Sequence, residues 1–262
     1  MLSLLGYDVF EIYTGRGPLE AIGGGVDFED GNVAIRCNFG SFVDGEIKNV
    51  RVEDISTEES KKLEQAINEF VQLTNAEFVF KSTMKYRGVL VLKSKQKLSA
   101  KITNTHPGYA LKPVISTHGS IQLSTALLHS EKKLQKSVPL ERTKEASFTS
   151  ELLNEFIKKS AEVLNNHPVN IERKAQGKEP ANVILTRDAG DRLPNLFNLC
   201  KTYGLKWGCF AEMPVERGIA HLSGMEIIPL PERGNNPEKY YWIWAQTVIK
   251  NMQFYDALYI HV

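Results

Sequence analysis

The sequence contains few cysteines and no paired metal-binding motif. A zinc site needs cysteines or histidines a few residues apart. The chain has only three cysteines, which are widely spaced and stand beside apolar neighbours, and its six histidines include no pair four residues apart. The sequence therefore predicts no metal site and three buried structural thiols. The residues concerned are Cys37, Cys200 and Cys209, and His106, His118, His129, His167, His221 and His261.

An excess of one charge and a long apolar run are also absent. The 32 basic and 31 acidic residues give a net charge of +1, which favours neither a nucleic-acid nor a membrane partner. No run reaches the ~18 apolar residues of a transmembrane helix. The start, MLSLLGYDVFEIY, has no basic region and meets Asp8 and Glu11 too early for a signal peptide. These features predict a cytoplasmic protein.

The middle of the chain has the pattern of an α+β module. Residues 32–42 alternate apolar and polar side chains, as a strand does. Ser56 and Glu59 form a capping box before an apolar face at helical spacing, and the segments AEFVF and YRGVLVL predict two further strands. Prolines and polar residues from about 105 to 147 predict a long mobile excursion. A helix is expected from about Ser150 until Pro168.

The last third changes character. NVILT, KWGCF, MEIIP and YDALYIHV are short apolar runs separated by helix-like stretches. This alternation predicts a mainly parallel sheet with crossover helices. Such a sheet needs cover on both faces, and this segment is too short to supply it. The fold class is therefore α/β, with an incomplete parallel layer and an inserted α+β domain.

The glycine-rich run GRGPLEAIGGG is a weak functional signal. It has no G-x-G-x-x-G after a strand and no Walker lysine, so it does not indicate a nucleotide site. Pro18 instead predicts the start of a short helix, which Gly23, Gly24 and Gly25 would end.

Isolated arginines are more informative. A guanidinium group is a planar fork that can hold a carboxylate or a phosphate through two hydrogen bonds. Arg187 directly follows the predicted strand NVILT. Ligands of open α/β sheets bind beyond the carboxyl ends of the strands, which is the position of Arg187. A structural salt bridge is the alternative for each arginine. The candidates are Arg16, Arg36, Arg173 and Arg187.

The order of several segments resembles one enzyme family. These segments are LSLLGYDVFEIYTGRGPLEAIGGGVDF, NVAIRCNF, HPVNIERKAQGKEPANVILTRDAG, RGIAHLSGMEII and YDALYIHV. Together they resemble the archaeal-type, cofactor-independent phosphoglycerate mutases of the alkaline-phosphatase-like superfamily. The resemblance implies an enzyme that interconverts 2- and 3-phosphoglycerate in glycolysis and gluconeogenesis through a phosphoserine, with divalent metals (manganese, magnesium or zinc) as cofactors.

The resemblance also implies a domain organisation and a set of substrate-binding residues. Residues 1–30 and 181–262 would belong to an incomplete alkaline-phosphatase-like layer, and residues 31–180 to the inserted substrate-holding domain. Positions that match the family are Tyr13, Gly15, Arg16, Glu20, Arg36, Asn38, Asn170, Arg173, Asn182 and Arg187. The substrate-binding residues that we expect are Arg16, Arg36, Asn38, Arg51, Arg173, Asn182 and Arg187.

The chain also departs from the family. The Asp-Gly metal motif and the nucleophilic serine are expected before LSLLGYD, where Met1 stands in place of a histidine, and the remaining metal ligands after YDALYIHV. We therefore assign no catalytic residue and expect this chain alone to be inactive. The altered family segments are KNVRVEDIS, which keeps only Arg51, His106-Pro107-Gly108, Tyr86-Arg87 and LPERGNNPEKY.

A second hypothesis is a non-catalytic paralogue that binds an anion or a protein. The edge of an incomplete sheet favours association with another chain or with a second copy. Basic residues between 113 and 147 alternate with acidic ones, so a solvated segment is the simpler interpretation there.

Overall fold

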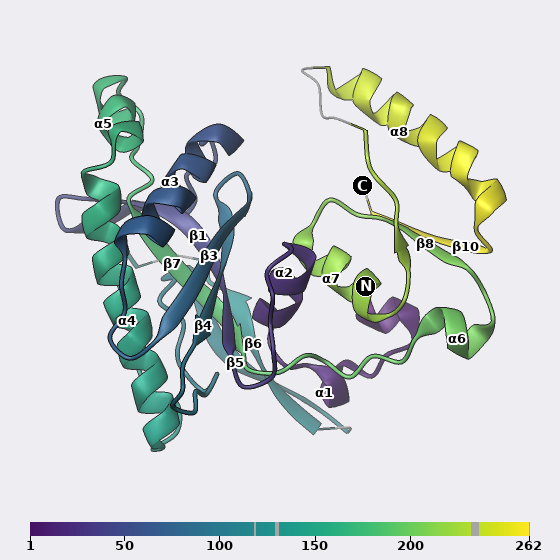
Figure 1. Ribbon diagram of the computed structural model, residues 1–262, viewed down its shortest axis with the longest axis horizontal. Coiled ribbons are helices and arrows are strands. Elements are labelled where there is room, and N and C mark those ends of the chain that lie inside the picture. The colour runs from purple at the N-terminus through teal and green to yellow at the C-terminus, as the bar shows by residue number, and fades with distance from the viewer. Residues whose placement is uncertain (118, 129–130, 232–235, 262) are drawn as a thin grey trace.

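The computed structural model describes residues 1–117, 119–128, 131–231 and 236–261. Its elements form two units with one helix between them (Figure 1). The antiparallel unit consists of strands β1–β4 and β7 with helices α3–α5. The parallel unit consists of strands β8–β10 with helices α6–α8 and the two short N-terminal helices. His118 and His129 lie outside the described residues.

The centre of the antiparallel unit is β1 (Val33–Val43), as the alternating pattern predicted. β4 (Arg87–Lys93) pairs with one side of β1, and β7 (Val183–Gly190) with the other. β3 (Glu77–Met84) continues the sheet beyond β4, and β2 (Glu46–Asn49) pairs with the end of β1 after an irregularity at Ser41 and Phe42. Every pair in this sheet is antiparallel.

Two long helices cover one face of this sheet (Figure 1). α3 (Thr57–Phe70) begins at the predicted capping box of Ser56 and Glu59. α4 (Lys144–Asn165) begins earlier than expected because the Thr143 side chain accepts a hydrogen bond from the Ala146 amide and caps the helix. α5 (Pro168–Ala175) follows.

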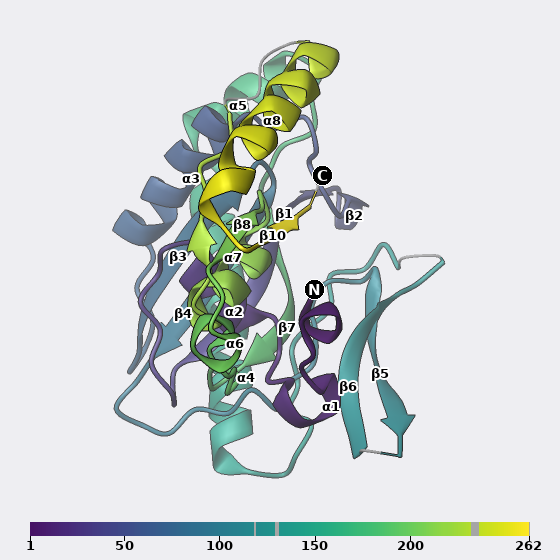
Figure 2. The same cartoon turned by 90° about the vertical axis from the view of Figure 1, so that its right-hand side faces the viewer.

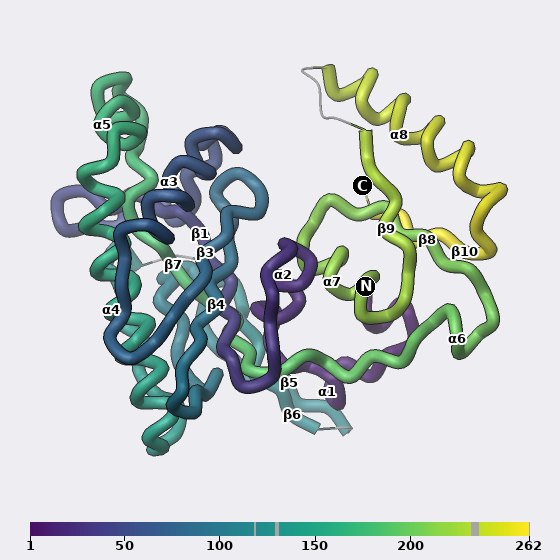
Figure 3. Tube along the Cα trace, in the orientation of Figure 1, coloured from purple at the N-terminus to yellow at the C-terminus, as the bar shows by residue number. Residues whose placement is uncertain are grey.

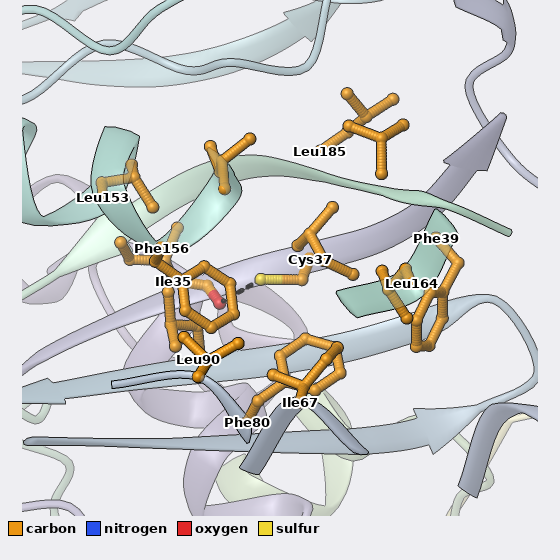
Figure 4. Close-up of a cluster of buried hydrophobic side chains, with 14 of the residues drawn as sticks. Ile35, Cys37, Phe39, Ile67, Phe80, Leu90, Leu153, Phe156, Leu164 and Leu185 are labelled. Carbon is orange, nitrogen blue, oxygen red and sulfur yellow. Dashed lines mark hydrogen bonds between the residues drawn. The ribbon is translucent and has the colours of Figure 1, made fainter. Parts of the chain in front are cut away.

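The main hydrophobic core lies between these helices and the sheet (Figure 4). Phe80 packs edge-on against Phe39, with ring centroids 5.6 Å apart. Cys37 and Cys209 are buried, as predicted, whereas Cys200 is only partly buried. The Cys37 thiol donates a hydrogen bond to the Ile35 carbonyl. Burial raises the pKa of this thiol well above its usual range, so it stays protonated and behaves as a small apolar side chain.

The prediction of a long mobile excursion from 105 to 147 is wrong. β5 (Tyr109–Ser116) and β6 (Gly119–Ala126) form an antiparallel hairpin that projects beside α1 (Figure 2). The chain then returns to the antiparallel unit, where Pro139 bridges to Ile102. Most residues of the hairpin are at least partly exposed, so burial did not impose the alternation that marks a half-buried strand.

The parallel sheet has the predicted direction. β10 (Ala257–Ile260) and β9 (Glu226–Ile227) flank β8 (Trp207–Phe210), and both pairs are parallel. The helices are α6 (Leu199–Tyr203), α7 (Pro214–Leu222) and α8 (Pro237–Asn251), with η2 (Met252–Phe254) after the last. η1 (Leu2–Leu5) and α1 (Val9–Ile12) lie near the start of the chain, and this unit thus contains the first helices and the last strand, β10 (Figure 3). None of the described helices combines the length and hydropathy needed to cross a membrane.

One strand belongs to the other unit. The sequence placed NVILT in the parallel layer, but β7 lies in the antiparallel sheet, where Phe39 is opposite Ile184. The prediction was wrong because a short buried apolar run has the same pattern in either kind of sheet. The chain passes to the parallel unit only after β7.

Helix α2 (Gly17–Gly23) joins the two units, and it begins and ends where Pro18 and the glycines predicted. One side packs on β1, β4 and β7, and the other on α7 (Figure 1). A β-carbon at Gly17 would lie 1.9 Å from the Ala34 carbonyl oxygen, and one at Gly23 would lie 1.7 Å from that of Pro214. These glycines therefore allow α2 to approach both units closely.

Candidate functional site

A polar cavity of about 280 Å³ lies where β1 and β7 face the start of α2. We call it the arginine pocket. It is lined by Arg16, Arg36, Asn38, Arg51, Tyr86, Arg87, Tyr109, Arg187 and Met213. Five of the seven predicted substrate-binding residues are in this list, although they come from four separate segments of the chain.

Strand register places four of these side chains on one face of the sheet. Arg36 is directly opposite Arg187 of β7, and Asn38 is directly opposite Arg87 of β4. Opposite residues of antiparallel strands point to the same side. Alternation along β1 turns Ile35, Cys37 and Phe39 into the core and leaves the polar residues between them for the pocket.

Glu20 of α2 partly balances two of the arginines. Its carboxylate is 3.3 Å from Nε of Arg36 and 3.7 Å from Nη2 of Arg16. Burial lowers the pKa of Arg36 to about 10, because desolvation outweighs the attraction of Glu20. Arg36 is therefore still a cation at neutral pH.

Arg187 has two further partners. It donates a hydrogen bond from Nη1 to the carboxylate of Asp188 at 2.5 Å, and its Cζ lies 4.0 Å from the centroid of the Tyr109 ring. Arg51 reaches the same tyrosine, since its Nη2 donates to the hydroxyl at 2.8 Å. Within the described part of the chain, the buried Nε groups of Arg36 and Arg187 make no hydrogen bond, and the contact of Arg36 Nε with Glu20 is an ion pair only.

The pocket carries an excess of positive charge. Five guanidinium groups line it, whereas the carboxylates paired with them are those of Glu20 and Asp188. Guanidinium groups around a restricted cavity attract anions and can hold them through charge-assisted hydrogen bonds. The arrangement fits a ligand with one or more phosphate or carboxylate groups.

His106 lies behind the pocket and is uncharged. Its pKa is lowered to about 3, chiefly by burial and in smaller part by repulsion from Arg187 and Arg51. Its Nδ1 accepts from the Gly108 amide, and its Nε2 is 3.2 Å from Nδ2 of Asn38. A neutral imidazole has one N–H, so it cannot accept at both nitrogens. The tautomer of His106 therefore decides which of these two N–H groups donates a hydrogen bond to the ring.

Two predicted residues are not brought to this pocket. Arg173 is buried and donates to Asp54, Glu59 and the Glu179 carbonyl, so its geometry is that of the alternative, a structural salt bridge. The side chain of Asn182, just before β7, bonds to the backbone of β1. Its Oδ1 accepts a hydrogen bond from the Phe42 N–H group, and its Nδ2 donates one to the Phe42 carbonyl. We leave both out of the candidate site.

Sequence reasoning did not assign Tyr86, Arg87, Tyr109 and Met213 to the site. Tyr86 and Arg87 stood out only as an altered family segment. The missing signal was strand register, since Arg87 reaches the pocket by pairing opposite Asn38. Met213 comes from the parallel unit, and its sulfur lies 3.0 Å from Nη1 of Arg87.

The described residues do not form a metal centre. No group of three or more histidine, cysteine, aspartate or glutamate side chains among them is arranged to hold an ion. They therefore do not fit the divalent metals that the sequence resemblance implies, and we derive no step through a metal. The altered segment LPERGNNPEKY falls partly on residues 232–235, outside the described residues.

Comparison with known proteins decides the family. Residues 1–170 match the family described as 2,3-bisphosphoglycerate-independent phosphoglycerate mutase. The chain belongs to this family. It is 39% identical over 230 residues to the enzyme of that name from Methanosphaera stadtmanae, covering 88% of this chain and 51% of the relative. It is 33% identical to one from Methanocaldococcus jannaschii, covering 100% of this chain and 58% of the relative.

The fold agrees with this family of mutases. A solved structure of the cofactor-independent phosphoglycerate mutase from Thermoplasma acidophilum covers 100% of this chain with a TM-score of 0.61 and 25% identity. The match spans 62% of that protein. The chain thus spans about half to three fifths of the length of the mutases that it resembles. Its mixed α/β architecture is that of the corresponding part of a mutase.

Proposed function

We propose that the arginine pocket binds the anionic groups of 2- and 3-phosphoglycerate, and that the chain is the substrate-holding part of a phosphoglycerate mutase. One observation carries the proposal: five arginines from separate segments surround a single small cavity. The matched relatives are named as mutases of this type. We further propose that the parallel unit is part of an alkaline-phosphatase-like layer.

The chemistry of phosphoglycerate suits the pocket. The molecule carries a phosphate and a carboxylate on three carbons, so it presents two anionic groups to guanidinium forks. Arg36 and Arg187 are neighbours across two strands, and Arg16 and Arg51 approach from the loops. A hydrogen bond to a charged group contributes roughly 1.5–3 kcal/mol. Two such contacts leave about millimolar affinity after the entropic cost of association.

The interconversion itself is a further proposal. Through the family, the isomerisation would proceed by transfer of the phosphoryl group to a serine with metal assistance. We assign no nucleophile among residues 1–262, and the described side chains supply no metal-ligand set. The proposed role of this chain is therefore to hold and orient the substrate, and a cytoplasmic location and self-association stay predictions.

A chemical-shift titration at low salt tests the binding role. We expect 3-phosphoglycerate to perturb the pocket arginines at millimolar concentration, and Arg187→Ala to weaken binding about tenfold, as the loss of one charged contact predicts. Arg142→Ala is the matched control, because this arginine is exposed and does not line the pocket. Equal effects of both variants on binding would contradict the proposal. So would the absence of any chemical-shift change at a 3-phosphoglycerate concentration of about ten times the expected millimolar dissociation constant.

The alternative hypothesis, a non-catalytic anion-binding paralogue, uses the same pocket. Inorganic phosphate and 3-phosphoglycerate should be compared in the same titration. A clear preference for phosphoglycerate favours the mutase role, because only that ligand offers a carboxylate to the additional guanidinium groups. Equal affinity for both would favour the general anion site.

A further inference from the structure

Tyr109 contacts two of the pocket arginines at once. Its hydroxyl accepts a hydrogen bond from Nη2 of Arg51 at 2.8 Å, and its ring lies 4.0 Å from Cζ of Arg187. Arg51 follows β2, Arg187 lies on β7, and Tyr109 is the first residue of β5. One aromatic side chain therefore joins cations from two distant segments of the chain.

The tyrosine does this without adding a negative charge. Neighbouring guanidinium groups repel one another, and a carboxylate between them would hold them by cancelling their charge. A phenol instead offers a neutral oxygen to one group and an aromatic face to the other. Within the described residues Arg51 forms no ion pair with a carboxylate, and its guanidinium group donates to the Tyr109 hydroxyl.

The tyrosine ring is itself held in place. It packs edge-on against His106, with ring centroids 4.9 Å apart and an interplanar angle of 84°. The Tyr109 amide also donates to the His106 carbonyl at 3.2 Å. His106 is fixed in turn by Asn38 and by the Gly108 amide. A continuous set of contacts thus runs from β1 through an uncharged histidine to Tyr109.

We propose that Tyr109 is a positioning residue of the arginine pocket: its side chain holds Arg51 and Arg187 toward the cavity before an anion binds. The inference rests on the proposed anion-binding function of this pocket. The hydroxyl acts on Arg51, and the ring acts on Arg187. An anion then meets preorganised cations, and Tyr109 itself has added no negative charge to them.

The first test uses the ligand-free protein, so it does not depend on any anion being bound. Nitrogen-15 spectra of the arginine side chains report rotation about the Nε–Cζ bond of each guanidinium group. We expect Tyr109→Phe to speed this rotation at Arg51 by about threefold to tenfold, the range for losing one hydrogen bond. Arg187 should change little, because phenylalanine keeps the ring. Tyr109→Leu should speed the rotation at both arginines, because it removes the hydroxyl and the aromatic ring together.

Tyr203→Phe is the control, because Tyr203 is exposed on α6 and does not line the pocket. Unchanged rotation at Arg51 in Tyr109→Phe would overturn the proposal. So would faster rotation at every arginine of Tyr109→Phe, because that would show a general loss of structure and no selective role of the hydroxyl.

The second test is a double-mutant cycle with 3-phosphoglycerate as the probe. Tyr109→Phe should weaken binding about threefold to tenfold in the wild-type background and have no effect in Arg51→Ala. An equal loss in both backgrounds would show that the hydroxyl does not act through Arg51 and would overturn the proposal. If the wild-type protein binds no anion, the proposed function fails, whereas the ligand-free spectra still decide whether Tyr109 positions the two arginines.

Discussion

Arg36 and Arg187 are opposite one another on neighbouring antiparallel strands, and both guanidinium groups reach the same small cavity. Both side chains are nine-tenths or more buried. Two cations so close together repel each other, and the fold offsets this with a separate carboxylate for each, Glu20 for Arg36 and Asp188 for Arg187. These carboxylates therefore hold the two arginines in place without a ligand, and a bound anion would reduce the repulsion that remains between the guanidinium groups.

Removing one of these carboxylates should destabilise the protein. Glu20 is 1% exposed and pairs with two arginines, so Glu20→Gln leaves a buried Arg36 without its counterion. We expect a loss of about 3 kcal/mol in the free energy of unfolding, measured by urea denaturation. Inorganic phosphate should restore more stability to this variant than to the wild type, because it can replace the missing negative charge.

The control for that experiment is Glu58→Gln. Glu58 is exposed on α3 and pairs with Lys62, so its replacement should change stability far less than Glu20→Gln does. A Glu20→Gln variant as stable as this control, or one that phosphate does not help, would show that Glu20 is not the counterion of the pocket.

His106 should make the protein less stable in mild acid. Its folded pKa of about 3 lies below the ordinary histidine value, so the unfolded chain binds the proton more readily. The contribution of neutral His106 to stability is complete above about pH 6.5, and it is lost as the pH falls toward the pKa of His106 in the folded protein. The free energy of unfolding should therefore fall by up to about 1.4 kcal/mol per pH unit through this window.

His106→Gln isolates this contribution, because glutamine does not titrate and can still form hydrogen bonds. The difference in unfolding free energy between wild type and variant should shrink as the pH is lowered from 7 to about 4.5. His167, whose pKa burial also lowers, is common to both proteins and cancels in this difference. A difference that stays constant over the range would contradict a buried, uncharged His106.

Gly23 should tolerate no β-carbon. A methyl group there would meet the Pro214 carbonyl oxygen at 1.7 Å, so Gly23→Ala must push α2 away from α7. Gly31→Ala is the comparison, because it has open space and adds only backbone strain at a φ of +97°. We expect Gly31→Ala to lower the free energy of unfolding by about 1 kcal/mol. Gly23→Ala should lower it, and with it the melting temperature, clearly more. Equal losses would show that α2 and α7 are not tightly packed.

Residues 1–262 alone should not interconvert 2- and 3-phosphoglycerate. We assign no nucleophile, and the described side chains form no metal-ligand set that could stabilise the transferring phosphoryl group. The measurement is an enolase-coupled assay with manganese, with a full-length family mutase as the positive control. Turnover that requires the metal and is abolished by a chelator would disprove this prediction.

Local patterns in the sequence determined several elements correctly. The alternation around Ile35 and Cys37 predicted β1, and the capping box of Ser56 and Glu59 predicted the start of α3. Pro18 marked the start of α2. These predictions succeeded because each rests on neighbouring residues, whose backbone conformation and hydrogen bonds are set within one or two turns of chain. The arginines were also recognisable as candidate anion-binding side chains, since the chemistry of a guanidinium group does not depend on the fold.

Tertiary structure alone decided which arginines share a cavity. Arg36 and Arg187 meet through strand register, whereas Arg173 is held by Asp54 and Glu59 and does not line the pocket. Register also placed β7 in the antiparallel sheet, because a short apolar run carries no mark of its partner. Tyr109 could not be predicted as the link between Arg51 and Arg187, since both contacts join residues far apart in the chain. Long-range contacts of this kind form only when the whole chain folds.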